Sequence, residues 1–532
     1  MDIVSSKANI LPSSLTEKTG VVVFARIITT VIDLALAIAV VRLLSKTDFA
    51  IMGYILMIHE VARNVAVLGF PDSVFYYFER LTNAARRGFV LQTIAILLIS
   101  GTVAGLAILG FNFFLPDLLS QWPEESIRML QHFLPFMALV SVLEIPTWPT
   151  TNILLASDRQ KEAAWYEMST SIVAFCALVL PLTLGYGLEL AIWSLVGYSV
   201  IRFIGSLVLL GIILPKDARL VDTQLDLTTT EKRELQGDYW MESQISLTDQ
   251  AKFALPLGLS SLVGRFNKYI DKFIVSIFLV NTAYAEYSVA ANEVPLIRVI
   301  PLAVGSVLIS RYVQFNLQSK KDKLLALWYR GIEKVSLLVI PMTILFTILA
   351  PELITFLFET DGVSYANAVL PFQLYNLIVL IRVTHYGSIL QAFGDTNGVF
   401  YFSLNLLAAN VLLSVPMTIY FGIVGTALAT LIANLYNWLL LLRRIGSHMK
   451  LPFWKVLPFP FYGKVLALSV SIGALMFMVK EYLLTNLAPL YSILSISLVY
   501  LVMYVVASRL IGLISQQDWK TLKHWAGLSF LR

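Results

Sequence analysis

Four charged residues interrupt an otherwise apolar stretch, "GRFNKYIDKFIVSIF" at 264–278. They are Arg265, Lys268, Asp271 and Lys272. At 100° per residue, the three cations fall within an arc of about 60° on a helix. An arginine or lysine at the centre of a bilayer costs about 2.5–3.5 kcal/mol, so this basic strip should face water or protein. Its chemistry is that of an anion-binding surface.

Other apolar segments also carry charged residues at helical spacing. The groups that would share a helix face or a turn are Arg26 with Asp33, His59 with Glu60 and Arg63, Glu293 with Arg298 (separated by Pro295), and Arg382 with His385. One interpretation is a set of internal ion pairs, in which Asp271 binds Lys268 and Glu60 binds Arg63.

The charges within these segments do not balance. The cations are Arg26, Arg42, Arg63, Arg202, Arg265, Lys268, Lys272, Arg298 and Arg382, and the acids are Asp33, Glu60, Glu144, Asp271 and Glu293. Arg42 and Arg202 could extend toward an interface, as long cationic side chains do near helix ends. The remaining cations still outnumber the acids, which predicts that an anion binds among them.

The elements that position these residues are membrane-spanning helices. The chain has 532 residues, of which 58% are hydrophobic and 14% charged, whereas about a quarter of a soluble domain is charged. Apolar runs of roughly 20 residues, enough to span a bilayer, recur from end to end. We predict an all-α polytopic membrane protein with about 14 transmembrane helices, several of them bent by internal prolines. The predicted spans include 131–155, 284–309, 365–390, 399–420 and 422–442.

One long polar interval divides the chain. We predict an N-terminal six-helix lobe at 1–214, a cytoplasmic connecting loop at 215–250, a C-terminal six-helix lobe at 251–445, and a helix pair with a cytoplasmic tail at 446–532. Residues 40–79 resemble 275–314 at an offset of 235, with Arg63 opposite Arg298. An even number of spans separates the copies, which predicts a parallel pseudo-twofold repeat around a central cavity, as in many transporters.

Lysine and arginine are concentrated in alternate loops. If the N-terminus lies inside, the cytoplasmic loops hold most of the 39 lysines and arginines, and the opposite loops are acidic, as in "LPDLLSQWPEES". The positive-inside rule therefore predicts that both termini are cytoplasmic. The cations are dispersed over many short loops, which argues against nucleic-acid binding.

Chemical catalysis has little support in the sequence. "HEVAR" lacks the second histidine of a zinc helix, and the single cysteine, Cys176, cannot build a thiolate metal site. We predict a protein that is not an enzyme and has no cofactor or metal site. Coupling to H⁺ or Na⁺ stays open, and the coupling or charge-balancing groups would be Asp33, Glu60, Asp271 and Glu293.

Several segments resemble a known family. "VVRLLSKTDFAIMGY", "VLGFPDSVFYYFER" and "AKFALPLGLSSLVGRFNKYIDKFIVSIFLVNTAYAEYSVA" are similar to segments of the polysaccharide flippases, the O-antigen (Wzx-like) transporters of the multidrug/oligosaccharidyl-lipid/polysaccharide (MOP) superfamily. The third has that family's pre-helix lysine, proline-led helix, interior aspartate and Tyr-Ser-x-Ala start of the next span. The likeness covers roughly 20–440, and the sequence departs at Ala50 and Glu286, where the family often has glycine.

This resemblance implies two six-helix lobes, a central cationic cavity and a C-terminal helix pair. In relatives that flip lipid-linked oligosaccharides, arginines of the first, second and eighth helices line the cavity, and the matching residues here are Arg26, Arg63 and Arg298. With the residues that the charge argument adds, the predicted substrate-binding set is Arg26, Arg63, Arg265, Lys268, Lys272, Arg298 and Arg382.

We therefore predict a flippase for polyprenyl-pyrophosphate-linked oligosaccharide repeat units in a bacterial-type cytoplasmic membrane. Alternating access would carry the units, on a carrier such as undecaprenyl pyrophosphate, from the cytoplasmic to the outer leaflet for polysaccharide biosynthesis. Its predicted partners are that lipid, the bilayer and a polysaccharide polymerase or export machinery. Two alternatives remain open: a cation-driven small-molecule antiporter of the same superfamily, which would want an acidic or aromatic cavity, and a membrane polysaccharide polymerase or ligase, which would need a long exterior loop.

Overall fold

The computed structural model describes residues 13–81, 83–214, 245–291, 295–360, 362–484 and 487–516. Helices make up nearly all of these ranges, and no strand occurs in them. Eleven helical segments within them are long and apolar enough to cross a membrane, which confirms the predicted all-α polytopic architecture. The count of about 14 spans stays a prediction. Most of the predicted connecting loop (215–244) and the end of the tail (517–532) lie outside the described residues.

The chain divides into two compact units, residues 1–269 and 270–532, and the boundary falls inside α11 (Leu247–Phe278). Besides the first part of α11, the first unit contains α1 (Ser13–Leu43), α2 (Lys46–Val67), α3 (Phe70–Tyr77), α4 (Asn83–Asn112), α5 (Leu115–Leu118), α6 (Glu124–Glu144), α7 (Thr150–Ala156), α8 (Gln160–Thr183) and α9 (Gly187–Ile213). The second contains α12 (Asn281–Ala290), α13 (Pro295–Leu317), α14 (Lys321–Ile348), α15 (Ala350–Phe358), α16 (Val369–Ile381), α17 (Tyr386–Ala392), α18 (Thr396–Met449), α19 (Phe459–Leu483) and α20 (Pro489–Leu510). The four lobe and loop ranges predicted from the sequence stay predictions.

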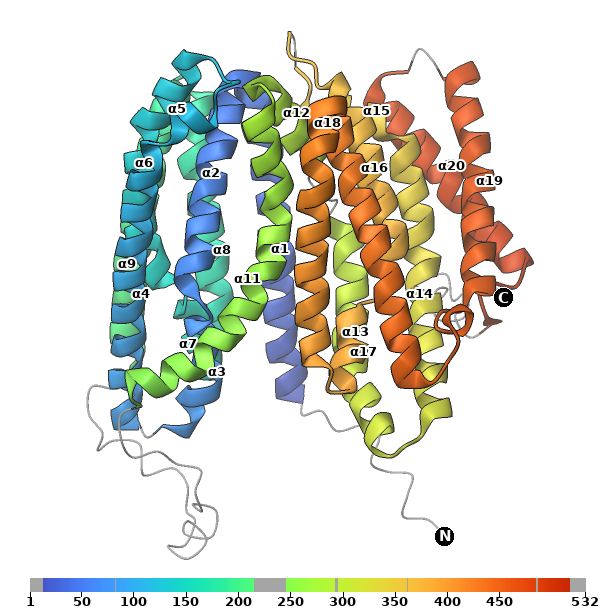
Figure 1. Cartoon of the computed structure of the whole chain (residues 1–532), viewed down its shortest axis with the longest axis horizontal. Coiled ribbons are helices and arrows are strands. Elements are labelled where there is room, and N and C mark those ends of the chain that lie inside the picture. Colours follow the sequence, from blue (N-terminus) through green and yellow to red (C-terminus); the bar gives the residue numbers. More distant parts are fainter. Residues whose placement is uncertain are drawn as a thin grey trace, which may run out of the picture. The chain divides into compact units, whose positions relative to one another are not determined.

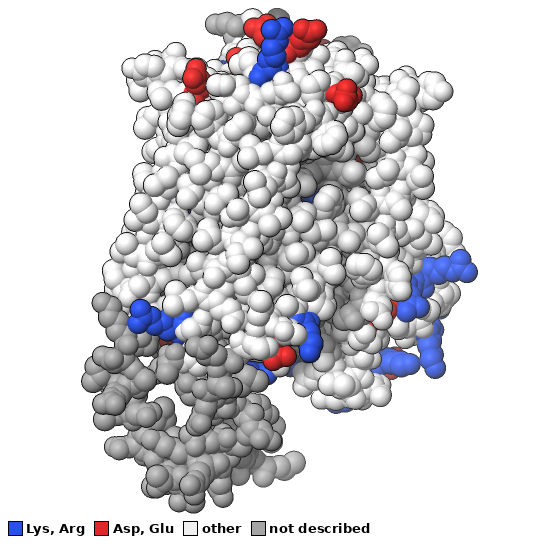
Figure 2. Space-filling model, turned by 60° about the vertical axis from the view of Figure 1, so that its left-hand side comes forward, with Lys and Arg blue, Asp and Glu red and all other residues white. Residues whose placement is uncertain are grey.

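The long helices of each unit run alongside one another (Figure 1). In the first unit, α2 packs on α4 and α6, and α8 packs against both α1 and α9. In the second, α14 packs on α13, α16 and α19, and α19 packs on α20. Helices suit this setting because each satisfies its own backbone hydrogen bonds where no water can do so. On the face drawn in Figure 2, charged side chains gather near the helix ends, and the band between them is almost uncharged.

A close backbone crossing fixes α11 in the first unit. α2 ends at Leu68 and Gly69, which both adopt the left-handed conformation, with φ of 37° and 76°. Gly258 of α11 lies directly against this break, because a Cβ atom at Gly258 would overlap the Leu68 carbonyl group. Only glycine allows two backbones to approach so closely.

We predict that Gly258→Ala destabilises the protein by about 1–3 kcal/mol or more, because the added methyl group has no room beside the Leu68 backbone. Gly264→Ala is the matched control: it lies on the same helix, and a Cβ atom there would meet nothing within 4 Å. Thermal unfolding of both variants in detergent measures the difference. Equal melting temperatures would contradict the tight crossing.

Three predicted spans contain breaks. The span at 131–155 ends its α-helix at Glu144, and a 3₁₀ turn at Ile145–Thr147 precedes α7. Pro146 and Pro149 explain this break, because neither can donate a backbone hydrogen bond. The span at 284–309 is divided between α12 and α13, which begins at Pro295.

The third break corrects a prediction about Arg382 and His385. The sequence suggested that they lie one turn apart on a single helix at 365–390. In the structure α16 ends at Ile381 and α17 begins at Tyr386, so both residues lie in the non-helical segment between them. The segment is only four residues long, Arg-Val-Thr-His at 382–385, and hydropathy averaged over about 19 residues does not reveal so short an interruption.

α18 is broken at Gly422, which has φ 60° and ψ −145°. The break divides it into two helical arms that form a hairpin, in agreement with the two predicted spans 399–420 and 422–442. The open end of this hairpin is closed by Asp395, which accepts hydrogen bonds from Arg444 (2.7 Å) and pairs with His448 (2.7 Å). The hydrogen bond from Arg444 holds the pKa of the Asp395 carboxyl well below its usual range.

The helix bounds support the repeat predicted from the sequence. Adding 235 to the bounds of α1 gives 248–278, against 247–278 for α11. The same shift takes α4 to 318–347, against 321–348 for α14, and it takes α9 to 422–448, against the second arm of α18, which runs from the break at Gly422 to Met449. The bounds of these three helices are therefore repeated in the second half to within a few residues.

The predicted C-terminal helix pair is present as α19 and α20 and packs on α14 and α15 in the second unit. Lys480 of α19 is buried and pairs with Glu352 of α15 at 3.0 Å. The Tyr504 hydroxyl of α20 donates to the Leu337 carbonyl of α14 at 3.1 Å. These contacts attach the pair firmly to the second unit.

Candidate functional site

Glu144, at the C-terminal end of α6, is the centre of a buried ion cluster in the first unit. It is 7% exposed. Arg202 of α9 donates to one of its carboxylate oxygens at 2.7 Å, and Arg63 of α2 lies 3.6 Å from the same oxygen. His59 of α2 contacts the other oxygen at 3.1 Å, and its second ring nitrogen lies 2.8 Å from the Ser141 hydroxyl. One carboxylate thus joins three helices.

Arg63 has further partners that fix its orientation. It donates to Glu60, one turn earlier on α2, at 2.5 Å, which confirms the ion pair suggested by the sequence. Its guanidinium also lies 4.2 Å from the ring centroid of Trp148, in a cation–π contact. Arginine suits such a position because its planar group can pair, donate and stack at once.

The cluster continues to the basic strip on α11. Arg265 donates to the Asn64 side-chain oxygen of α2 at 2.6 Å, and the Tyr269 hydroxyl donates to Glu60 at 3.3 Å. Lys268 is exposed and lies 5.2 Å from the Tyr269 ring. The first part of the strip therefore lies against α2, next to the residues that hold Arg63.

This cluster, which we call the Glu144 cluster, carries surplus positive charge. Its arginines are Arg63, Arg202 and Arg265, and its carboxylates are Glu60 and Glu144. The Nε atoms of Arg63 and Arg202 are buried and find no hydrogen-bond acceptor among the described residues. Glu60 and Glu144 match Arg63 and Arg202 in number, so the surplus charge belongs to Arg265, which is exposed at the edge of the cluster. The arrangement can therefore accept an anion.

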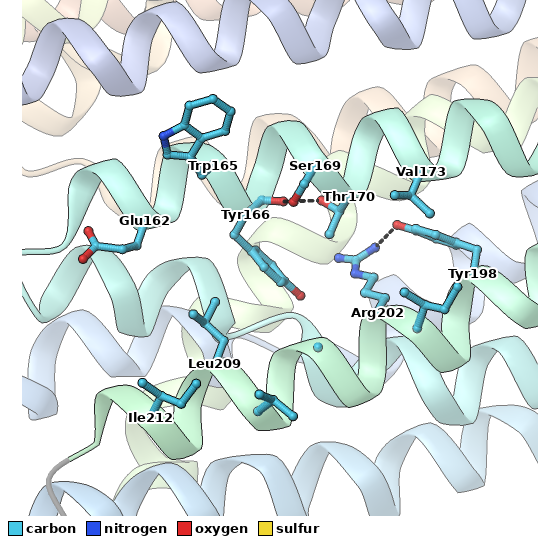
Figure 3. A pocket seen from close by; sticks show the side chains of 13 residues that line it. Glu162, Trp165, Tyr166, Ser169, Thr170, Val173, Tyr198, Arg202, Leu209 and Ile212 are labelled. Atoms are coloured by element: carbon cyan, nitrogen blue, oxygen red, sulfur yellow. Dashed lines mark hydrogen bonds between the residues drawn. The ribbon is translucent and has the colours of Figure 1, made fainter.

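Arg202 corrects an expectation from the sequence. We considered that it could extend toward an interface, but its guanidinium is turned inward to Glu144 and to the Tyr198 hydroxyl, which accepts at 3.0 Å (Figure 3). The sequence contained Glu144 as an acid within a span but gave no sign of its partners. Its position beside "IPTWP", where a helix must break, is the signal that could have marked it.

Asp271 is the centre of a second polar cluster, in the second unit. It is 4% exposed and accepts hydrogen bonds from Tyr375 (2.7 Å), Thr430 (3.0 Å) and Asn410 (2.5 Å). The Tyr375 hydroxyl also lies 2.6 Å from that of Tyr287. In the part of the chain that the structure describes, no cationic side chain pairs with Asp271. The suggested pair with Lys268 is therefore not formed, because neutral donors from α16 and both arms of α18 surround the carboxylate.

The other predicted site residues are more dispersed. Arg26 and Asp33 are both exposed on α1, and Lys272 of α11 is partly buried. Arg382 donates to the Asn434 side chain at 3.2 Å. Arg298 lies on α13, but its side chain is outside the described structure, as is the whole of Glu293. Of the predicted set, the structure brings Arg63, Arg265 and Glu60 together in the Glu144 cluster.

Solved structures define the class of protein. The fold resembles that of the lipid II flippase MurJ in an inward closed conformation, with a TM-score of 0.66 and 15% identity over 92% of this chain and 99% of that one. It also resembles an inward-facing multidrug resistance MATE family transporter, with a TM-score of 0.62 and 14% identity over 79% of this chain and 96% of that one. A MOP superfamily transporter from Pyrococcus furiosus gives a TM-score of 0.54 and 13% identity over 81% of this chain and 95% of that one. The protein therefore has the fold of the MOP superfamily of membrane transporters.

The sequence then defines the family. The family model described as "Polysaccharide biosynthesis protein" matches residues 15–314, more than half of the chain, and the protein belongs to this family. A relative described as "Probable low-salt glycan biosynthesis flippase Agl15", from Haloferax volcanii, is 24% identical over 212 residues, or 39% of this chain. The match spans 43% of the length of that relative.

Proposed function

We propose that this protein is a flippase for lipid-linked glycans. It moves polyprenyl-pyrophosphate-linked oligosaccharide units from the cytoplasmic to the outer leaflet by alternating access, with both termini in the cytoplasm. Membership of the polysaccharide biosynthesis family and the description of Agl15 as a glycan biosynthesis flippase support this substrate class. The fold that it has in common with MurJ and the MATE transporters supports transport across the bilayer.

The observation that carries the proposal is the surplus of arginine in the Glu144 cluster. A diphosphate is a compact dianion, and arginine binds phosphate oxygens through paired, charge-assisted hydrogen bonds. Arg63 and Arg202 each keep a buried Nε–H without an acceptor among the described residues, and Lys268 is exposed on α11 next to Tyr269, which donates to Glu60. The proposed substrate-binding residues are therefore Arg63, Arg202, Arg265 and Lys268, with Arg26, Lys272, Arg298 and Arg382 as further candidates.

A polar passage is needed because the barrier to unassisted crossing is high. The hydrocarbon core is about 30 Å thick, and each unpaired hydroxyl group that enters it costs several kcal/mol. Cationic groups that receive the diphosphate lower this barrier, while the prenyl chain remains in lipid. An inside-negative membrane potential adds about 2.3 kcal/mol per charge per 100 mV in favour of outward movement of an anion.

Asp271 is the proposed coupling group for H⁺ or Na⁺. Its carboxylate is buried among neutral donors, so a bound proton or sodium ion would neutralise it where no cationic side chain does. Glu60 is proposed to balance charge and not to couple to an ion, because it is paired with Arg63 in the anion-binding cluster.

A reconstituted flipping assay tests the proposal. In proteoliposomes that contain a fluorescent polyprenyl-pyrophosphate oligosaccharide, we expect Lys268→Ala to flip about tenfold more slowly than the wild type, because one charge-assisted contact is lost. Lys252→Ala is the matched control: it removes an exposed lysine of the same helix, about 160° away from Lys268. The control should flip at the wild-type rate. Equal rates for both variants would exclude the basic strip as the diphosphate site.

The antiporter alternative predicts a different substrate. A cationic compound would be repelled by the arginine surplus of the first unit, whereas the exposed Asp33 on α1 could attract it. Efflux of a cationic dye from the same vesicles, together with no movement of the lipid-linked oligosaccharide, would favour the antiporter and contradict the flippase.

A further inference from the structure

A groove lies between α8 and α9 in the first unit, apart from the Glu144 cluster but ending at one of its arginines. It has a volume of about 530 Å³. Trp165 and Tyr166 of α8 and Leu209 and Ile212 of α9 are among the residues that line it, and Val173, Tyr198 and Arg202 lie at its inner end, away from Glu162 (Figure 3). Its walls are therefore largely carbon, and its one arginine already binds Glu144.

The floor of the groove is open space. A Cβ atom on Gly205 would meet no atom within 4 Å, although this glycine lies in the middle of the lining. The rim residues Trp165, Ile201, Val208 and Ile212 are all exposed. Large apolar side chains at the rim of an empty groove on a membrane helix pair are typical of a lipid-binding surface.

The length of the groove is close to the thickness of one leaflet. The lining runs from Glu162 to Val173 on α8 and from Tyr198 to Ile212 on α9. The eleven residue steps on α8 span about 16 Å and the fourteen on α9 about 21 Å, and half of a 30 Å hydrocarbon core is about 15 Å. A single hydrocarbon chain that is anchored at one membrane surface would therefore fill the groove and end beside Tyr198.

The end of the groove at the start of α8, opposite Tyr198, carries basic and aromatic residues. Arg159 immediately precedes α8 and Lys161 lies in its first turn, six and four residues before Trp165. Arg159 pairs with the exposed Glu162 at 3.3 Å, so the charges of these three residues sum to one positive charge. Cations and tryptophan at the membrane surface hold anionic headgroups in place.

We propose that this groove binds one anionic phospholipid, with its acyl chain between α8 and α9 and its phosphate beside Arg159 and Lys161. The prenyl chain of a glycan carrier fits less well, because it is longer than one leaflet is thick and the lining of the groove ends at Val173 and Tyr198. This inference does not depend on the proposed flippase activity.

Photocrosslinking of the full-length protein in liposomes tests this site. The probe is phosphatidylglycerol with a diazirine in the middle of one acyl chain, and mass spectrometry locates the labelled residues. We expect labels between 165 and 173 and between 201 and 212. Gly205→Leu fills the open space and should lower this labelling by about tenfold, because several methylene groups lose their contacts. Gly211→Leu is the matched control, since it adds the same side chain to the same helix, in open space outside the lining.

Each outcome decides the proposal. Reduced labelling in Gly205→Leu and wild-type labelling in Gly211→Leu, at equal melting temperatures, support the site. Equal labelling of the two variants overturns it. Lys161→Gln should lower labelling by phosphatidylglycerol but not by a phosphatidylcholine probe, and equal labelling by both probes in the wild type would overturn the anionic headgroup. Displacement of the probe by equimolar polyprenyl phosphate would assign the groove to the carrier lipid instead.

Discussion

Glu144→Gln should destabilise the protein by about 3–5 kcal/mol, because it removes the carboxylate that a buried cluster of cations shares. Arg202 at 2.7 Å and Arg63 at 3.6 Å would then face a neutral amide, and their side chains are only 15% and 14% exposed. The free energy of unfolding in detergent, or the melting temperature, measures this loss. We also expect flipping to fall with the fraction of folded protein.

Two control variants separate charge from a general effect of substitution. Glu124→Gln makes the same chemical change on the same helix, where the side chain is 88% exposed and pairs with Arg128, so it should cost less than about 1 kcal/mol. The double variant Glu144→Gln/Arg202→Gln removes one charge of each sign and should recover part of the lost stability. If the double variant is as unstable as the sum of its single changes, the two residues are not energetically coupled.

Asp271→Asn should abolish the response of flipping to an ion gradient. Asparagine has nearly the shape of a protonated aspartate, so it should keep the contacts with Tyr375 and Thr430 but hold no charge for a proton or sodium ion to neutralise. We expect the variant to flip at the gradient-free rate of the wild type and to melt at the same or a higher temperature, since a buried charge has been removed. The measurement is the flipping rate under an imposed Na⁺ gradient and, separately, an imposed pH gradient.

The matched control is Asp249→Asn, an exposed acid at the start of the same helix. It should respond to both gradients as the wild type does. A variant at Asp271 that still accelerates with the gradient would show that coupling takes place elsewhere. A wild-type protein that responds to membrane potential but to neither ion would show that the potential alone drives transport.

The sequence predicts the long helices well, because hydropathy identifies the segments that can cross a membrane and glycine marks positions where a helix can break. The predicted boundary between 399–420 and 422–442 coincides with Gly422, whose left-handed φ breaks α18. The spacing of Glu60 and Arg63 also predicts their ion pair, since both residues lie on one helix. Local periodicity carries this kind of information.

Contacts between distant segments could not be predicted in the same way. Glu144 and Arg202 are separated by 58 positions, and nothing in their local sequences pairs them. Asp271 has a cation three residues before it, so local spacing suggested an ion pair, yet its partners come from α16 and α18. In each case tertiary packing determines which group pairs with a buried charge, and helical spacing alone cannot predict that partner.

The offset of 235 has a consequence for how such a chain could have evolved. If the two halves descend from one duplicated ancestor, the lengths of α1, α4 and α9 have been conserved while the polar residues have diverged. Glu144 corresponds by this offset to Val379, Arg202 to Asn437, and Asp271 to Leu36. Bilayer thickness acts on both copies alike and holds every span to its length. Side-chain chemistry has no such constraint, so the polar residues of the Glu144 cluster and around Asp271 differ between the two halves.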